Sequence, residues 1–252
     1  MKKHVYALIL LIVLLSGCSN QTQQQTVITV SAASSLSDVL QDVAAQFQEE
    51  HPTISIQFNF GASGSLKEQI EQGAPVDLFL SASSEKYEEL VNEQLIDHSV
   101  NLASNEIVLI TSVKSTVNLH EFSDLVHDDI EKIAIGTPTV VPAGTYGKQA
   151  LHYYDVWKSS ENKIVYAKDV RQVLTYVETN NAQAGFVYKT DALASEKVRI
   201  VKTADESSHD VIFYPAGVVN NTKAPEEASL FLQYLQSKDV QHIWKQYGFQ
   251  ME

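Results

Sequence analysis

The chain has 252 residues, a single cysteine and a formal net charge of −13 at pH 7, from 18 basic and 31 acidic side chains. This acidic balance argues against nucleic acid as a partner and against a basic membrane-binding face, because both depend on clustered Lys and Arg. One cysteine cannot form a disulfide within the chain or a thiolate metal cluster, so packing must stabilise the fold.

The first residues are predicted to form a signal peptide that the mature protein lacks. Two lysines precede the apolar run 5–15, which is shorter than the roughly 20 residues that span a bilayer. The run leads into LSGC at 15–18, which resembles the lipobox of bacterial lipoproteins. We therefore expect a signal peptide over 1–17 and a lipidated Cys18 with a flexible tether over 18–26. The alternative is a plain secretory signal with a free thiol.

Strand and helix patterns alternate along the rest of the chain. Strands are expected at 27–30, 54–60, 76–80, 107–111, 133–135, 164–166, 186–188, 198–201 and 211–213. Helices are expected at 36–50, 65–72, 85–96, 144–156, 169–180, 225–236 and 239–247. This alternation predicts an α/β fold with mainly parallel sheets flanked by helices.

The length after the signal peptide favours two lobes over one large sheet. The polar stretch 101–105 and the bend 214–217, which contains Pro and Gly, are the expected crossover points. If the chain crosses at both, lobe 1 consists of 27–104 plus 214–252, and lobe 2 consists of 105–213.

Small or hydroxyl residues occur where four of the expected helices begin. The four segments are AASSL at 32–36, GASGSL at 61–66, VPAGTY at 141–146 and AKDVR at 167–171. A helix start exposes backbone N–H groups that lack intrahelical partners, and these groups can bind an anion without a cationic side chain. Such turns gather at the carboxyl edge of parallel strands, so the four segments are predicted to form one site.

Each turn also has an ordinary structural explanation when it is taken alone. Ser35 and Ser65 both stand three residues before an acidic side chain, which is the spacing of a capping box. Ser63 is not needed for either box, so we predict that its hydroxyl faces a ligand. Lys168 and Arg171 are expected on an exposed helix face.

Neutral donors suit a fully ionised tetrahedral dianion, because its oxygens only accept hydrogen bonds. Without the two lysines of the signal peptide the mature chain has a net charge near −15, which would repel an anion if it acted without screening. Helix-end dipoles act at short range in a cleft, however, whereas distant surface carboxylates are screened by salt. Phosphate, which is partly protonated at neutral pH, would be better served by an acidic acceptor that none of the four turns clearly offers.

Taken in order, these motifs resemble the molybdate-binding proteins of ABC importers, in the type II class of periplasmic solute-binding proteins. The resemblance runs from about residue 27 to 249 and rests on AASSLSDVLQDVAAQF, FGASGSLKEQIEQGAPVDLFLSAS, TPTVVPAGTYGKQAL, AKDVRQVLTYVE, AGFVYKTDA and YGF. It implies a two-lobed periplasmic binding protein fold with the ligand in the interlobe cleft. It also implies a monomeric receptor outside the cytoplasm, anchored to the membrane at Cys18, that passes its anion to a permease with ATPase subunits.

The resemblance also implies which residues bind. Carried over by motif, Ser35 and Ser63 would donate from lobe 1 through hydroxyl and amide, and the amides of Ala143 and Val170 would donate from lobe 2. Tyr188 would supply a phenol. The implied ligand is molybdate, and tungstate as well, held without a cofactor, a cation or a free metal ion, and without catalysis.

Other functions stay open on the residues alone. Sulfate or another tetrahedral oxyanion is the alternative within the binding class. A serine hydrolase could use Ser63 at a strand–turn–helix, although Ser65 replaces the second glycine of the G-x-S-x-G elbow, and His209 lies downstream as a candidate base. A metal-binding importer component is disfavoured, because the eight histidines show no metal-ligand spacing.

Overall fold

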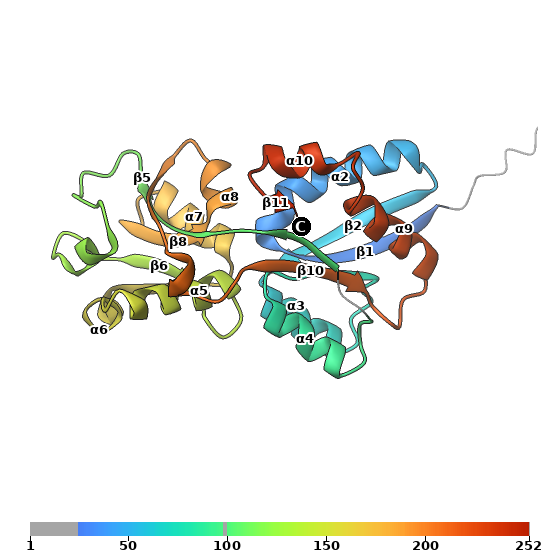
Figure 1. Ribbon diagram of the computed structural model, residues 1–252, viewed down its shortest axis with the longest axis horizontal. Helices are drawn as coiled ribbons and strands as arrows, with labels where there is room; N and C mark the ends of the chain where they lie inside the picture. The colour runs from blue at the N-terminus through green and yellow to red at the C-terminus, as the bar shows by residue number, and fades with distance from the viewer. Residues whose placement is uncertain (1–24, 98–99, 252) are drawn as a thin grey trace, which may run out of the picture.

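The computed structural model describes residues 25–97 and 100–251. The expected signal peptide, Cys18 and most of the expected tether therefore lie outside the described residues. Figure 1 shows two sheets, each flanked by helices, arranged one after the other along the longest axis of the molecule. No helix within the described ranges is long and apolar enough to cross a membrane.

The sheet of lobe 1 contains six strands among the described residues, in the order β11-β4-β10-β3-β1-β2. Their bounds are β1 Thr26–Ala33, β2 Ile54–Gly61, β3 Leu78–Leu80, β4 Val100–Ser104, β10 Phe213–Val218 and β11 Gln250–Met251. β1 lies between two parallel partners, β2 and β3, and is buried over its second half. Because β1 begins at Thr26, that residue belongs to the sheet and not to the expected tether.

The sheet of lobe 2 contains five strands among the described residues, in the order β7-β6-β8-β5-β9. Their bounds are β5 Ile107–Ser112, β6 Ile133–Gly136, β7 Ile164–Ala167, β8 Ala184–Tyr188 and β9 Val198–Thr203. The strands β5, β6 and β8 are buried along their whole length, because helices cover both faces of this sheet (Figure 1).

Helices flank both sheets on two sides. The α-helices of lobe 1 are α2 Ser37–Glu50, α3 Ser63–Glu71, α4 Ser84–Asn92, α9 Pro225–Leu235 and α10 Gln241–Gln246. Those of lobe 2 are α5 Pro142–Tyr153, α6 Trp157–Ser160, α7 Val170–Glu178 and α8 Lys189–Leu193. Four short 3-10 helices complete the described structure: η1 Ser34–Leu36, η2 Phe122–Val126, η3 Glu161–Lys163 and η4 Glu206–Ser208.

Apolar spacing explains why these helices form where they do. In α7 the buried side chains recur at three- and four-residue intervals, at Val170, Val173, Leu174 and Val177, which places them on one face of a helix with 3.6 residues per turn. Asp169 caps this helix by accepting a hydrogen bond from the backbone N–H of Gln172 at 2.8 Å. The expected helix at 169–180 is therefore found with nearly the expected bounds.

Both sheets are mixed, which corrects the expectation of mainly parallel sheets. In lobe 1, β10 is antiparallel to β3 and β4, and β11 is antiparallel to β4. In lobe 2, β5 is antiparallel to both β8 and β9. The strands by which the chain enters each sheet after a crossover, β5 and β10, run against their neighbours, whereas β4 and β9, by which it leaves, run in the same direction as the βαβ strands.

The two crossovers join β4 to β5 through residues 105–106, and β9 to β10 through 204–212. The bend expected at 214–217 is instead part of β10, and the strand expected at 211–213 begins only at Phe213. Pro215 is tolerated in this interior strand because the β10–β4 register shifts between Phe213 and Pro215. The strands of each sheet support lobe boundaries near 104 and 213, which we retain as a proposal.

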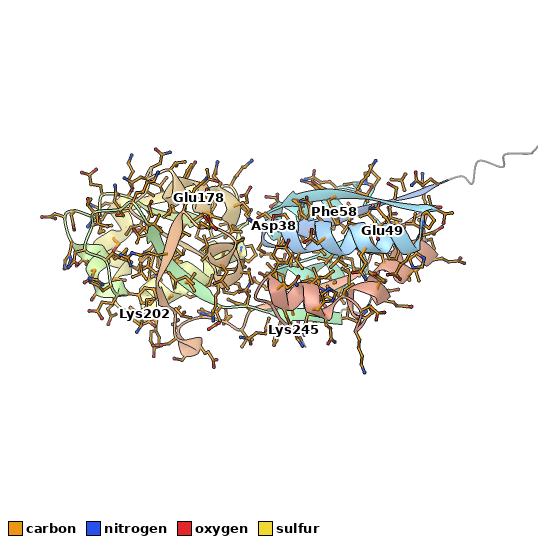
Figure 2. All side chains as sticks on the ribbon, turned by 90° about the horizontal axis from the view of Figure 1, so that it is seen from above. Asp38, Glu49, Phe58, Glu178, Lys202 and Lys245 are labelled. Carbon is orange, nitrogen blue, oxygen red and sulfur yellow. The ribbon has the colours of Figure 1, made fainter. Side chains whose placement is uncertain are left out.

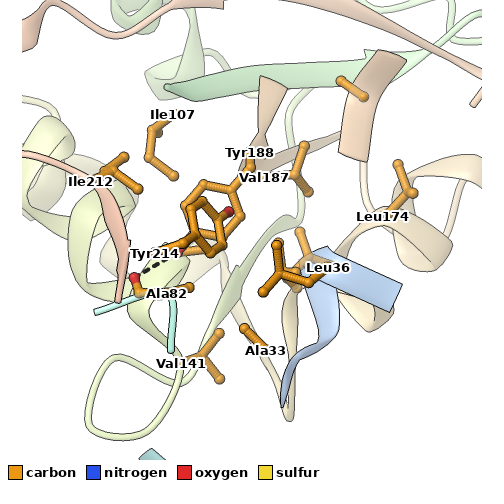
Figure 3. Packing of buried hydrophobic residues seen from close by; sticks show 14 of the residues in the cluster. Ala33, Leu36, Ala82, Ile107, Val141, Leu174, Val187, Tyr188, Ile212 and Tyr214 are labelled. Atoms are coloured by element: carbon orange, nitrogen blue, oxygen red, sulfur yellow. Dashed lines mark hydrogen bonds between the residues drawn. The ribbon is translucent and has the colours of Figure 1, made fainter. Parts of the chain in front are cut away.

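A single apolar cluster extends through both lobes and across their junction. Figure 3 shows part of it, with Ala33 and Leu36 from lobe 1 close to Val187 and Tyr188 from lobe 2. A second, smaller cluster lies beneath α3 and α4 and includes Leu66, Phe79 and Tyr87, among others. The shared cluster brings the helix starts of the two lobes to the same place.

Candidate functional site: a cavity between the lobes

A small cavity lies where the two lobes meet. Its lining comes from the β1–η1 turn, the β2–α3 turn, Ala82 after β3, the start of α5, the start of α7 and the end of β8. It contains about 190 Å³ of space, part of which is open to solvent. The lining includes all of the predicted site residues, namely Ser35, Ser63, Ala143, Val170 and Tyr188.

Four backbone N–H groups at this cavity have no hydrogen-bond partner among the described residues. They belong to Ser35, Ser63, Ala143 and Val170. Ser63 and Val170 are the first residues of α3 and α7, and Ala143 is the second residue of α5, so helix geometry gives their N–H groups no intrahelical acceptor. These four residues are all buried. Buried N–H groups without a protein partner are rare and costly, so these four groups are candidate donors to a ligand.

The hydroxyl of Ser63 is held by the backbone of lobe 1. Its Oγ accepts a hydrogen bond from the N–H of Ala82 at 2.9 Å. Because a serine hydroxyl has one hydrogen to donate, that hydrogen remains available for a ligand. No imidazole forms a hydrogen bond with Ser63 within the described part of the chain, and the ring centroid of His209 lies 5.9 Å from that of Tyr146.

The hydroxyl of Ser35 belongs to a chain of polar side chains that the sequence analysis did not identify. Its Oγ lies 3.2 Å from the Oη of Tyr214, and that oxygen accepts a hydrogen bond from the amide nitrogen of Asn105 at 3.1 Å. Tyr214 was assigned to a bend and Asn105 to a polar linker, so only the folded chain reveals their proximity to Ser35.

Two tyrosines of lobe 2 approach the carbonyl of Ala82 in lobe 1. Tyr188 and Tyr146 each place their Oη 3.4 Å from that oxygen; Figure 3 shows Tyr188 beside Ala82 and Tyr214. Burial raises the pKa of Tyr188 well above its usual value and that of Tyr146 to about 12. Both phenols therefore stay protonated at neutral pH, and each has one hydrogen to donate.

Further contacts tie the lobes together around the cavity. The N–H of Gly64 donates to the carbonyl of Val140 at 2.9 Å. A Cβ at Gly64 would lie 2.7 Å from the Cα of Val140, so this approach requires glycine. Gly64 thus explains one of the small residues in the turn at 61–66: it lets α3 contact the loop that precedes α5.

Arg171 does not lie on an exposed helix face, which corrects the sequence expectation, whereas Lys168 is exposed as expected. The guanidinium of Arg171 contacts the carboxylate of Asp38 in lobe 1 at 2.6 Å and that of Asp191 in lobe 2 at 3.0 Å. Its Nε also lies 3.3 Å from the carbonyl of Ser34. Figure 2 shows Asp38 at the end of lobe 1 that faces lobe 2.

The two capping boxes considered for the site turns are not present. Helix α3 begins at Ser63, two residues before the expected start, with Ala62 at the N-cap and no side-chain cap. Helix α2 begins at Ser37 after a 3-10 turn that contains Ser35, and it also lacks a side-chain cap. The N–H groups at these starts are therefore not satisfied by serine or glutamate side chains. No cluster of three His, Cys, Asp or Glu suited to a metal occurs in the described ranges.

Two helix-flanked lobes that meet at a small cavity lined with hydrogen-bond donors define a two-lobed solute-binding protein. The chain belongs to the family of bacterial extracellular solute-binding proteins, which it matches over residues 28–250.

Similar proteins agree with this assignment. The chain is 45% identical over 246 residues to YvgL of Bacillus subtilis (strain 168), provisionally named an ABC transporter substrate-binding lipoprotein, covering 95% of this chain and 94% of that one. It is 37% identical over 231 residues to the molybdate-binding protein ModA of Escherichia coli (strain K12), covering 88% of each. These relatives confirm the resemblance to molybdate-binding proteins of ABC importers that the motifs predicted.

A solved structure confirms the fold class. The periplasmic molybdate-binding protein of Azotobacter vinelandii matches with a TM-score of 0.79 at 22% identity, over 89% of this chain and 99% of that chain. The α/β architecture with two sheets is therefore that of the periplasmic binding proteins.

Proposed function

We propose that this protein captures molybdate, and tungstate as well, outside the cytoplasm and delivers it to an ABC permease. The observation that carries the proposal is the set of four unpaired, buried N–H groups at Ser35, Ser63, Ala143 and Val170, two from each lobe. The hydroxyls of the two serines add two further donors, and the phenol of Tyr188 adds a third when its hydrogen turns from the Ala82 carbonyl, 3.4 Å away, to the anion. The similarity to ModA supports molybdate as the ligand.

The chemistry of these donors favours a fully ionised tetrahedral oxyanion. Every proposed ligand group is neutral, and each can donate a hydrogen bond to an oxygen that only accepts. Helix starts from both lobes direct the positive ends of their dipoles at the same small cavity. An anion that bridges these ends binds the closed arrangement better than the open one, so binding shifts the population toward closure.

The proposal extends to attachment and transport. Cys18 carries the lipid anchor that holds the receptor at the outer face of the cell membrane, as the LSGC segment predicts. The receptor acts as a monomer and performs no catalysis, so ATP hydrolysis belongs to partner subunits of the importer. The name of YvgL as a substrate-binding lipoprotein supports this part of the proposal.

Isothermal titration with molybdate, tungstate, sulfate and phosphate tests the ligand assignment. We expect molybdate and tungstate to bind with one anion per protein. Binding of sulfate alone would replace molybdate by the alternative ligand in the same cavity. Absence of binding to both molybdate and tungstate would overturn the proposal.

Removing both serine hydroxyls tests the site residues. Hydrogen bonds to a charged group contribute about 1.5–3 kcal/mol each, so Ser35→Ala with Ser63→Ala should weaken molybdate binding by roughly 3–6 kcal/mol. Ser65→Ala is the matched control, because Ser65 lies in the same turn but does not line the cavity. Unchanged affinity in the double variant, measured by titration calorimetry, would show that the serines are not ligands.

A further inference from the structure

The amide of Asn105 has a fixed orientation. Its Oδ1 accepts a hydrogen bond from the N–H of Glu106 at 2.9 Å. The opposite end, Nδ2, must then be the nitrogen, and it donates to Tyr214 Oη at 3.1 Å and to Thr190 Oγ1 at 2.9 Å. An amide nitrogen only donates, so the phenol oxygen of Tyr214 is the acceptor in its bond with Asn105.

This assignment determines where the phenol hydrogen of Tyr214 points. Tyr214 is fully buried, and burial together with the charge of Asp191 raises its pKa well above the usual value, so the phenol stays protonated. Its one hydrogen cannot point at the Asn105 nitrogen, which is itself a donor. The other hydrogen-bond partner of the phenol in the described structure is Ser35 Oγ at 3.2 Å, so Tyr214 donates to Ser35.

Ser35 Oγ therefore accepts a hydrogen bond from Tyr214, and the hydroxyl hydrogen of Ser35 remains free to donate. We infer that Asn105 and Tyr214 form a directional hydrogen-bond relay that makes the Ser35 hydroxyl a donor toward the bound oxyanion. They are positioning residues, because neither lines the cavity. The inference rests on the proposed function, since it concerns how the same site binds its anion.

The two serines of the site then have the same hydrogen-bonding role: each oxygen accepts from the protein, and each hydrogen can donate to the ligand. Ser63 Oγ accepts from the N–H of Ala82, and Ser35 Oγ accepts from the phenol of Tyr214, so one lone pair of each serine oxygen is occupied while its hydrogen is free to donate. Neither can easily accept a hydrogen bond from a protonated oxyanion, which favours anions without an O–H group.

The relay also connects the site to the crossovers between the lobes. Asn105 lies on the first crossover, between β4 and β5, and Tyr214 lies in β10 directly after the second. Thr190, the other acceptor of the Asn105 amide, belongs to α8 of lobe 2. The orientation of the Ser35 hydroxyl in lobe 1 is therefore set by residues on the segments that connect the two lobes.

Tyr214→Phe tests the relay, because it removes the phenol oxygen and keeps the ring that packs against Tyr188 and Phe249. Losing one neutral hydrogen bond that orients a ligand group should weaken molybdate binding about threefold to tenfold. Tyr234→Phe is the matched control, because its phenol bonds Glu50 in lobe 1 and should not affect binding.

The decisive measurement is the same substitution in a Ser35→Ala background. If Tyr214 acts through Ser35, Tyr214→Phe should change affinity by less than about twofold there, because the hydroxyl that it orients is already absent. An equal loss in both backgrounds would show a merely structural role at the crossover and overturn the relay. If Tyr214→Phe does not fold, Asn105→Ala replaces it in a second double-mutant cycle with Ser35→Ala. The same criterion applies: the effect of Asn105→Ala on affinity should nearly vanish in the Ser35→Ala background.

The wild-type titration separates this inference from the proposed function. Wild-type protein that binds molybdate, combined with additive effects of Tyr214→Phe and Ser35→Ala, would refute only the relay. Wild-type protein that binds neither molybdate nor tungstate would refute the proposed function and the relay with it.

Discussion

The carboxylate of Asp191 is fully buried in lobe 2, beside the site helix α7. Arg171 Nε lies 3.0 Å from its Oδ1, yet neither carboxylate oxygen receives a well-oriented hydrogen bond within the described residues. Burial therefore raises the pKa of Asp191 to about 6, although the charge of Arg171 acts in the opposite direction. An ionised Asp191 therefore costs folding free energy, although the proposed ligand groups nearby are all neutral.

The raised pKa of Asp191 predicts a pH dependence of stability. Below its ordinary pKa of 3.8 the carboxyl is protonated in both the folded and unfolded states. As pH rises toward 6, the unfolded chain ionises first, so the free energy of unfolding falls. Relative to Asp191→Asn, wild type should lose on the order of 2–3 kcal/mol between about pH 4 and pH 7.

Denaturant unfolding of both proteins across this pH range measures the effect. The exposed Asp128→Asn serves as the charge-matched control. A constant difference in unfolding free energy between wild type and Asp191→Asn would contradict the raised pKa.

At the scale of elements, the position of each helix start decides whether donors reach the cavity. Helix α3 begins at Ser63 and touches lobe 2 through Gly64, whose N–H bonds the carbonyl of Val140. Helix α5 packs even more closely on its own sheet, since a Cβ at Gly144 would lie 1.9 Å from the carbonyl oxygen of Gly136. The glycines in these turns thus serve close backbone contacts, and the serines supply hydrogen bonds.

Gly64→Ala should impair closure without unfolding the protein. The new methyl group would lie 2.7 Å from the Cα of Val140, so α3 and lobe 2 must move apart. Alanine is the better helix former by about 1 kcal/mol, so the melting temperature without ligand should not fall. We expect about tenfold or greater loss of molybdate affinity. Wild-type affinity in this variant would mean that the Gly64–Val140 contact does not matter for binding.

Most elements were predictable because their apolar periodicity is local. The strand β2 and the helix α7 follow their periods of two and 3.6, and the structure has them within a few residues of the expected bounds. β4 was not predicted, because its sequence VNLAS is short and polar and becomes a strand only between β10 and β11. The mixed direction of the sheets also depends on distant pairing, which local patterns do not report.

The candidate site also has parts that local sequence patterns predict and parts that depend on distant contacts. The four turns were predictable because helix starts are marked in the sequence, whereas the resemblance supplied the individual residues, all of which line one cavity. Asn105, Tyr214 and Arg171 act through partners more than a hundred residues away. Only the fold brings these side chains to the site, so no spacing in the sequence could identify them.

For the whole molecule, the proposed binding mode couples anion binding to the contact between the lobes. The ion pair of Arg171 and Asp38 joins α7 to α2 at 2.6 Å beside the cavity. Both side chains are partly exposed, at 27% and 39%, so the pair contributes modestly and is screened by salt. It favours closure without contacting the proposed ligand groups of the cavity lining.

Asp38→Asn should therefore weaken molybdate binding by about twofold to fivefold at low salt, within the range measured for exposed ion pairs. The difference from wild type should shrink as salt is added, because the lost interaction is electrostatic. Lys197→Gln is the control, since its contact with Glu178 lies within lobe 2. Titrations at several salt concentrations decide the matter, and parallel salt curves for Asp38→Asn and wild type would contradict this role.

A crystal structure of the molybdate complex, with the anion located by the anomalous scattering of molybdenum, is the most direct test of the proposed binding mode. The account predicts the anion in the interlobe cavity, with its oxygens within hydrogen-bonding distance of the hydroxyls of Ser35 and Ser63 and of the N–H groups of Ala143 and Val170. Contact between the anion and Arg171 or a bound metal ion, or an anion outside this cavity, would contradict it.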